Sequence, residues 1–259
     1  MRDFFERISF SKWALGLVWL LTLMAYSGVL AAGFVWDDFP LVLENPLTAS
    51  FSQAPEWFRA DLWGGLGAEG YDSGFYRPLV LASFTFDRVV LGGTPGLSHL
   101  HSLFWHLGVV GLLFVLLTRV LGRSGAMLGA TFFALHPVQT EGVVWVAARN
   151  DPMSAFFLLG SLLFLFNHRP SRRALFFGSL FFLLALLSKE SSLLGGVFLM
   201  LIDWGRWGRP QGLVRYASLA VAVLCWLGLR SWAGVHASDL ELGPGLSLLA
   251  ENGDEVFSH

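Results

Sequence analysis

The sequence predicts an all-α polytopic membrane protein with about seven transmembrane helices. Of its 259 residues, 54% are hydrophobic and only 14% are charged, with a mean hydropathy of +0.59. Soluble domains carry about 25% charged residues, so this chain has too little polar surface to cover a globule in water. The apolar residues form continuous runs, such as Leu158–Phe166 and Leu175–Leu187, which favours helices over the alternating strands of a β-barrel.

Seven apolar segments can be distinguished, and two of them, the third and the sixth, are short for a full span of about 20 residues. The first follows Arg2, Arg7 and Lys12, so a cleaved signal peptide is an alternative, but its length and the six later segments favour an uncleaved helix. The segments are roughly residues 13–33, 98–118, 125–137, 150–167, 174–188, 191–204 and 214–233.

The basic residues predict a cytoplasmic N-terminus. With that orientation, 11 of the 17 Lys and Arg residues lie on the inner side and 6 on the outer side. Lysine is almost absent, with only Lys12 and Lys189, which hints at a GC-rich bacterial genome. We therefore expect a multi-pass protein of the bacterial inner (cytoplasmic) membrane whose outer side faces the periplasm.

Residues 1–233 form the predicted membrane module, and residues 234–259 a polar outer tail that reads as the start of an incomplete loop. The first outer loop, 34–97, is too long for a passive connector. Its aromatic and aliphatic residues predict a helix that lies in the membrane interface with these side chains on one face: Phe51, Trp57, Phe58, Leu62 and Trp63.

Asp37 and Asp38 follow the first apolar segment directly. Two carboxylates at a membrane surface are costly unless they are solvated, paired or metal-bound. Burial and mutual repulsion would raise the pKa of one of them, which suits a general base. The alternative is a solvated helix end without a catalytic role.

A second polar stretch, residues 136–151, lies on the outer side between two apolar segments. Arg149 could hold a phosphate, because a guanidinium donates two parallel hydrogen bonds to phosphate oxygens. The alternative is an ion pair of Arg149 with Asp151 or Glu141. Asp151 is also expected to cap the next helix, with Pro152 at its first position.

The tripeptide Ser188-Lys189-Glu190 interrupts an apolar run on the outer side. It indicates either a residue pair that faces a cavity or a simple polar hairpin between two helices. His99 and His106 share a helix face, but no third ligand is evident, so hydrogen bonding is favoured over a metal site. We expect no metal and no cofactor.

Several function classes are excluded by missing patterns. The sequence has no glycine-rich nucleotide loop, no Gly-x-Ser-x-Gly elbow and no His-Glu-x-x-His motif, which argues against a cytoplasmic nucleotide-using enzyme. It has no basic block, so nucleic acid is not an expected partner. A transporter is disfavoured because the polar residues gather on one side of the membrane.

An ordered set of short motifs spans about residues 30–204. They are Phe34-Val35-Trp36-Asp37-Asp38, Glu44-Asn45-Pro46, Tyr76-Arg77-Pro78-Leu79, His99, His106, Ala134-Leu135-His136-Pro137, Thr140-Glu141, Trp145, Arg149, Asp151, Ser188-Lys189-Glu190 and Asp203-Trp204. In these residues the chain resembles the transmembrane and tetratricopeptide-repeat (TMTC) glycosyltransferases of the C-type glycosyltransferase (GT-C) superfamily, which are related in design to protein O-mannosyltransferases.

The resemblance implies an enzyme that moves a mannose-like sugar from a polyprenyl-phosphate carrier to an acceptor, often a protein hydroxyl, on the outer face of the membrane. It implies that Asp37 or Asp38 is the general base, with Asp38 preferred. Arg149 and Lys189 would bind the lipid-linked phosphate. The remaining residues expected at the substrate pocket are Arg77, Glu141, His136, Asp151 and Glu190.

Two departures from the family pattern accompany this resemblance. Family members usually have more transmembrane helices followed by repeats, and Ser102 stands at a position that is often Asn. The alternative expectation is therefore a truncated, non-catalytic subunit that binds the lipid carrier or a partner membrane protein, such as a missing C-terminal half.

Overall fold

The computed structural model describes residues 2–66, 73–167 and 169–235. Across these ranges the chain is helical and has no strand, which confirms the all-α prediction. The predicted polar tail, 234–259, lies outside the described residues except for Gly234 and Val235.

Six longer helices make up the body of the described chain. They are α1 (Arg2–Ala25), α4 (Pro95–Leu135), α6 (Asn150–Phe164), α7 (Arg172–Leu186), α8 (Gly195–Trp207) and α9 (Leu213–Trp232). Three further α-helices are α2 (Ala54–Trp57), α3 (Pro78–Val89) and α5 (Thr140–Val144). Short turns of other helix types are η1 (Ser27–Ala31), η2 (Phe39–Glu44), η3 (Pro46–Thr48), η4 (Phe51–Gln53), η5 (Gly64–Leu66), η6 (Pro137–Gln139), η7 (Val146–Arg149) and η8 (Glu190–Leu194).

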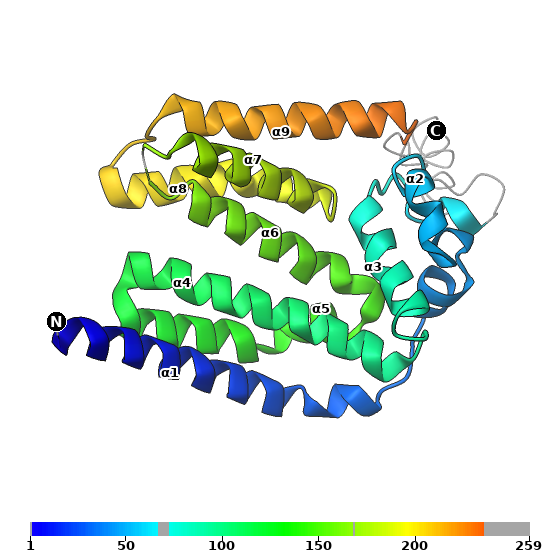
Figure 1. Ribbon diagram of the computed structural model, residues 1–259, viewed down its shortest axis with the longest axis horizontal. Coiled ribbons are helices and arrows are strands. Elements are labelled where there is room, and N and C mark those ends of the chain that lie inside the picture. The colour runs from blue at the N-terminus through cyan, green and yellow to red at the C-terminus, as the bar shows by residue number, and fades with distance from the viewer. Residues whose placement is uncertain (1, 67–72, 168, 236–259) are drawn as a thin grey trace, which may run out of the picture.

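Helix α4 is two helices joined by a sharp reversal at Gly122 (Figure 1). Gly122 has φ 74° and ψ −175°, a conformation that is open to glycine because it has no Cβ. The second half folds back on the first, since the His106 ring contacts the carbonyl of Ala134 at 3.2 Å. The predicted segments 98–118 and 125–137 are therefore confirmed as two separate helical segments.

The membrane topology is only partly supported by helix lengths. Two of the described helices, α4 and α9, are long and apolar enough to cross a membrane, and the apolar part of α1, Trp13–Ala25, is shorter. Helices α6 and α7 have 15 residues each, which corresponds to about 22 Å, less than the roughly 30 Å of a hydrocarbon core. The seven-span topology thus stays a prediction.

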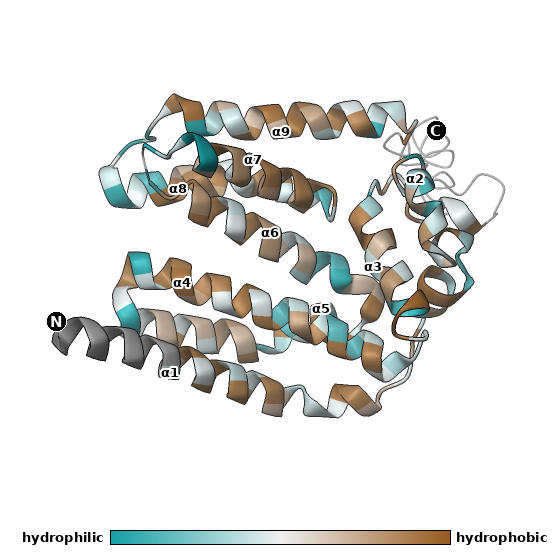
Figure 2. Cartoon of the chain, viewed as in Figure 1, coloured by the Kyte–Doolittle hydropathy of each residue, from teal (hydrophilic) through white to brown (hydrophobic). Residues whose placement is uncertain are grey.

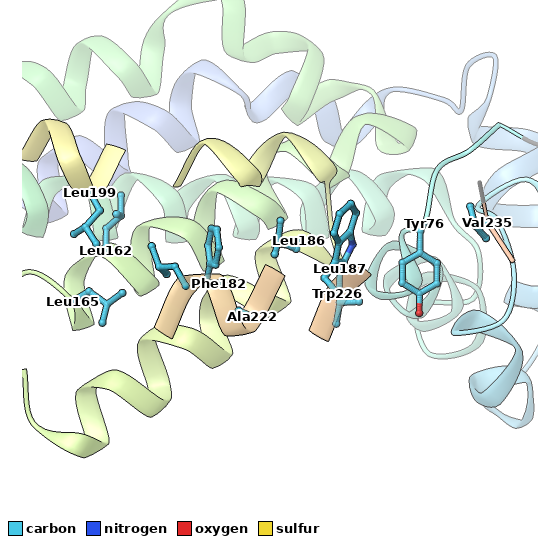
Figure 3. Close-up of a cluster of buried hydrophobic side chains, with 11 residues drawn as sticks. Tyr76, Leu162, Leu165, Phe182, Leu186, Leu187, Leu199, Ala222, Trp226 and Val235 are labelled. Atoms are coloured by element: carbon cyan, nitrogen blue, oxygen red, sulfur yellow. The ribbon is translucent and has the colours of Figure 1, made fainter. Parts of the chain in front are cut away.

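The helices form two groups that meet at one capped end (Figure 1). Helix α1 packs on the α4 hairpin through Val18, Phe114 and Ala130. Helices α6 to α9 share a core in which Phe182, Leu199 and other buried side chains interdigitate (Figure 3). Apolar residues run along the helices, whereas hydrophilic residues gather at the turns at the end that carries the N-terminus (Figure 2).

The first outer loop folds into a compact cap rather than the single interfacial helix predicted for it. Helix α2 has only four residues, and Trp57 and Leu62 are buried in a cluster with Phe84 of α3. The carboxylate of Asp61 accepts the backbone N–H groups of Trp63 and Phe75, both at 2.8 Å. Because these bonds bend the chain back on itself, Trp57 and Leu62 pack inward and Phe51 stays exposed, and the set does not line one helix face.

A buried ion pair joins α8 to α9 at the end opposite the cap. Asp203 pairs with Arg215, and both side chains are inaccessible to solvent. The hydroxyl of Tyr216 donates to Asp203 at 2.7 Å, and Arg215 also donates to the carbonyl of Leu165 at 2.7 Å. This cluster ties the turn after α6 to the α8–α9 turn.

We predict that Arg215→Gln lowers the free energy of unfolding by about 3–5 kcal/mol, because it leaves the Asp203 carboxylate buried without its cation. The unfolding midpoint in a mild detergent measures the effect. Arg209→Gln, an exposed change in the same turn, is the control and should be neutral. The double variant Asp203→Asn/Arg215→Gln should recover part of the loss; a single variant as stable as the control would contradict the prediction.

Candidate functional site

A cavity of about 390 Å³ lies where the cap meets the turns before α6 and after α7. It brings together five residues that the sequence singled out and that are far apart along the chain: Asp37, Arg77, Glu141, Asp151 and Lys189. Its other walls include the aromatic side chains of Trp63, Phe75 and Trp145. Charged groups and aromatic faces thus surround a space large enough for a small polar ligand.

The acidic pair sits in a tight turn that points its two carboxylates to different places. The backbone N–H of Asp38 donates to Val35 O at 2.9 Å, and the N–H of Val35 donates to the Asp38 carboxylate at 3.0 Å. Between them Trp36 has φ 45°, in the left-handed region that costs a bulky residue free energy. As a result Asp37 is half-buried at the cavity, while Asp38 is fully buried.

Asp38 is a structural anchor in this geometry. Its second carboxylate oxygen accepts the N–H of Ala147 in η7 at 2.7 Å, so both oxygens are occupied by backbone donors. Burial raises the pKa of Asp38, and the two N–H donors and the nearby charges of His99 and Arg149 oppose this. Asp38 does not line the cavity. The preference for Asp38 as the base therefore finds no support in the geometry, which favours Asp37.

Arg149 is fully buried beneath the cavity rather than exposed in it. Its guanidinium pairs with Asp87 of α3 at 2.5 Å and donates to Ser83 at 2.9 Å and to Ser102 at 3.0 Å. It also donates to the carbonyl of Ser98 at 2.7 Å. The expected ion pair with Asp151 or Glu141 is wrong, and with these partners in place we assign no phosphate contact to Arg149.

Asp87 was missed at the level of the sequence. It lies four residues after Ser83, on the same face of α3. The sequence predicts this segment as part of the first outer loop, 34–97, and not as a helix. A carboxylate inside the mostly apolar stretch 79–91 could have indicated a buried ion pair, because a buried charge of this kind needs a cation. Ser102, at the position that departs from the family pattern, fills a matching place on α4 as an acceptor for Arg149.

Lys189 and Arg77 are the two cations that line the cavity, and each is paired with an acid. The Lys189 ammonium contacts the Asp151 carboxylate at 2.5 Å, and this carboxylate side chain is 50% exposed. Arg77 donates twice to Glu190, at 2.9 and 3.1 Å, and its guanidinium lies 4.2 Å from the Phe75 ring centroid. The Lys189 pair is the more exposed of the two, so its charge is the easier one to redirect.

Asp151 and His136 differ from their expected roles. Asp151 lies in the first turn of α6 but makes no capping bond, so the predicted cap is wrong; its charge still complements the positive end of the helix. His136 accepts the N–H of Val138 at 3.1 Å at the start of η6 and does not line the cavity. His99 contacts the carbonyl of Gly33 at 3.3 Å, whereas His106 contacts the carbonyl of Ala134 at 3.2 Å, so the two rings have different partners. Among the described residues no group of three potential ligands is placed to hold a metal.

The chain is similar in sequence to several curated proteins. The chain is 31% identical over 139 residues to the mouse protein O-mannosyl-transferase TMTC3, which covers 53% of this chain and 15% of that protein. It is 30% identical over 176 residues to the Drosophila melanogaster protein O-mannosyl-transferase Tmtc1, covering 67% and 20%. It is 30% identical over 154 residues to human TMTC2, covering 59% and 18%.

The chain is thus similar to the TMTC protein O-mannosyl-transferases over the aligned part. The predicted resemblance is thereby confirmed. No family model matches the chain. No solved structure matches it either. The aligned part makes up about a fifth or less of each of these relatives.

A second, partly polar chamber adjoins the cavity. It measures about 460 Å³ and shares Glu141 and Asp151 with the cavity. Ser192 of η8 lines it and is nearly fully buried, with no hydrogen-bond partner for its hydroxyl. The two acids therefore lie at the boundary between two adjoining spaces, one against the cap and one between α4, α6 and α8.

Asn150 is a further cavity residue that the sequence did not reveal. Its side chain is 7% exposed, and its amide donates to the carbonyl of Ala147 at 3.4 Å. The amide oxygen has no hydrogen-bond partner. A buried acceptor at a cavity wall can take a hydrogen bond from a ligand hydroxyl. Its place next to the conspicuous Arg149 and Asp151 hid it, because an Asn before a helix reads as a capping residue.

We predict that Asp87→Asn lowers the free energy of unfolding by about 3–5 kcal/mol, because the Arg149 cation then stays buried without its ion-pair partner. The unfolding midpoint of the purified protein in detergent is the readout. Asp151→Asn serves as the control, because it breaks a half-exposed pair that contributes about 0–1 kcal/mol. Equal stability of the two variants would contradict the role given to the Asp87–Arg149 pair.

Proposed function

We propose that this TMTC-like chain forms the catalytic module of a membrane glycosyltransferase, which moves a mannose-like sugar from a polyprenyl-phosphate carrier to a protein hydroxyl. The observation that carries the proposal is the cavity in which Asp37, Lys189 and Glu141 meet. The names of the relatives describe protein O-mannosyl transfer, which is the same class of reaction. The site would face the periplasm of a bacterial cell, in line with the distribution of basic residues.

Asp37 is the general base in this proposal. It lines the cavity, and unlike Asp38 it makes no described hydrogen bond that would occupy its carboxylate. Its carboxylate takes the proton of the acceptor hydroxyl while the hydroxyl oxygen attacks the anomeric carbon of the donor. The bond between that carbon and the phosphate oxygen breaks, and the carrier phosphate leaves with the electron pair. A single displacement of this kind inverts the configuration at the sugar.

Lys189 stabilises the leaving phosphate. Its present partner, Asp151, is half exposed and lies at the boundary between the cavity and the chamber. A donor phosphate can replace this carboxylate, because a charge-assisted hydrogen bond to phosphate matches the one that is lost. Fixed cations at a developing negative charge lower the barrier of such reactions. Arg77 stays bonded to Glu190 and shapes the wall beside the phosphate.

The remaining wall residues hold the sugar. Glu141 and Asn150 present acceptor oxygens for sugar hydroxyl groups, and the Trp63 and Trp145 rings offer apolar faces to the sugar ring. Aromatic walls with a few placed polar groups are typical of small-molecule pockets. The proposed donor brings its own leaving group, so the reaction as written needs no cofactor.

We predict that Asp37→Asn lowers the rate of transfer about 100-fold or more, because the acceptor proton then has no base. The assay follows sugar transfer from polyprenyl-phosphate mannose to a Ser- and Thr-containing peptide in proteoliposomes that contain the purified chain. Donor binding and the unfolding midpoint should stay unchanged. Glu56→Gln, an exposed change in the same loop, is the matched control.

The same assay separates the proposal from its alternative. A wild-type chain that binds the donor without turnover would favour a non-catalytic subunit that holds the lipid carrier. Full activity in Asp37→Asn would remove the assigned base. Absence of both donor binding and transfer in the wild type would overturn the proposal.

We predict that Lys189→Gln raises the KM for the lipid-linked donor by roughly 10-fold or more, because a charged hydrogen bond to phosphate contributes about 1.5–3 kcal/mol. The KM for the peptide should stay the same, because the acceptor carries no phosphate. An Asp151→Asn variant provides a comparison in which the lysine is retained and released from its partner. A donor KM unchanged by Lys189→Gln would place the phosphate elsewhere.

A further inference from the structure

An apolar groove of about 640 Å³ runs along the α4 hairpin, α6 and α8. It begins at Val109 and Phe133, which it shares with the polar chamber, and extends to Val120 and Arg206. Arg206 is the polar residue of its lining; Gly205 adds no side chain, and the other lining residues are apolar. The far end of the groove lies where α4 reverses and α8 ends, opposite the cap (Figure 1).

Two arginines converge at this end of the groove. The guanidinium of Arg206 lies 3.9 Å from the centroid of the Phe166 ring, and that of Arg119 lies 5.2 Å from the same centroid. Both residues are exposed, and no ion pair with a carboxylate of the described chain engages either of them. A cation over a ring gains about 0.5–1 kcal/mol at such a site but keeps its charge. Two like charges near one ring, neither of them paired with a carboxylate, therefore favour the binding of an anion at this end of the groove.

The shape of the groove restricts what can occupy it. From Val109 to Val120 the helix rises about 16 Å, which is close to half of the roughly 30 Å hydrocarbon thickness of a bilayer. This is the depth of one leaflet, which one acyl chain spans, and the apolar walls suit such a chain.

We propose that this groove binds an anionic glycerophospholipid, with one acyl chain along α4 and α8 and its phosphate between Arg119 and Arg206. Basic pockets between membrane helices are suited to acidic lipid headgroups, with about 1 kcal/mol gained per Lys or Arg. The hydrophilic residues at this end of the molecule place it at a membrane surface (Figure 2). The distribution of basic residues predicts that this surface is the cytoplasmic one. The site is distinct from the cavity at Asp37 and does not depend on the proposed reaction.

The charge arm of the test uses purified protein in a neutral detergent, to which phosphatidylglycerol or phosphatidylcholine with identical acyl chains is added. Native mass spectrometry counts bound lipid, and the unfolding midpoint follows stabilisation. We predict that the wild type retains phosphatidylglycerol preferentially, and that Arg119→Gln/Arg206→Gln weakens this binding about 10-fold or more. Arg209→Gln, which removes the same charge from the same end of the molecule, should leave it unchanged.

The groove arm uses two glycines of α8. A Cβ added at Gly205 or at Gly196 would meet no atom within 4 Å, so neither change creates a clash. Gly205 lines the groove and Gly196 does not. We expect Gly205→Leu to fill the groove and abolish lipid retention, whereas Gly196→Leu, with the same gain in helix propensity, retains lipid like the wild type. Unfolding midpoints without lipid check that all variants are folded.

Three outcomes would overturn the proposal. The first is equal retention of the two phospholipids by the wild type, and the second is normal retention by Gly205→Leu. The third is displacement of the bound lipid by polyprenyl phosphate in a manner that depends on Lys189 and not on the two arginines. That result would assign the groove to the tail of a donor whose phosphate lies at the opposite end.

Discussion

The buried pair of Asp87 and Arg149 holds together the parts of the chain that build the cavity. One guanidinium joins α3, α4 and η7, because its partners Asp87, Ser102 and the carbonyl of Ser98 come from two different helices. Two residues before Arg149, the N–H of Ala147 donates to Asp38, so the first outer loop is attached to the same turn, η7. A buried cation with a full set of acceptors tolerates few other arrangements. The position of Asp37 at the cavity follows from this constraint.

The cavity is also shaped by an excess of acids over bases. Four carboxylates surround it or pair at its edge, namely those of Asp37, Glu141, Asp151 and Glu190, against the two cations of Arg77 and Lys189. Both cations are thus neutralised by neighbouring acids. An incoming phosphate competes with Asp151 for Lys189, whereas a neutral sugar hydroxyl meets acceptors that are ready to bind it. This arrangement favours recognition of the sugar as much as recognition of the charge.

Much of this could be read from the sequence, and the exceptions have physical causes. The apolar segments and the short motifs predicted an all-helical chain and five of the cavity residues, because hydrophobicity and charged residues at loop ends are local signals. Which of Asp37 and Asp38 faces the cavity could not be predicted from local sequence. It depends on the left-handed conformation of Trp36 and on the backbone N–H of Ala147, which is more than a hundred residues away. The partner of Arg149 was missed for the same reason, since Asp87 reaches it only through the packing of α3. The interfacial helix failed because Asp61 bends the loop.

The reversal at Gly122 determines at which end of the molecule the later loops lie. A continuous helix of the 41 residues in α4 would be about 62 Å long, twice the hydrocarbon thickness of a bilayer, and would carry Leu135 far from Pro95. With the bend, α4 is a helical hairpin, and residues 136–151 return to the cap from which α4 started. One glycine with a positive φ therefore determines that residues 136–151 lie at the same end of the molecule as the start of α4. A deletion or insertion that abolished this bend would place the two halves of the cavity at opposite ends of the molecule.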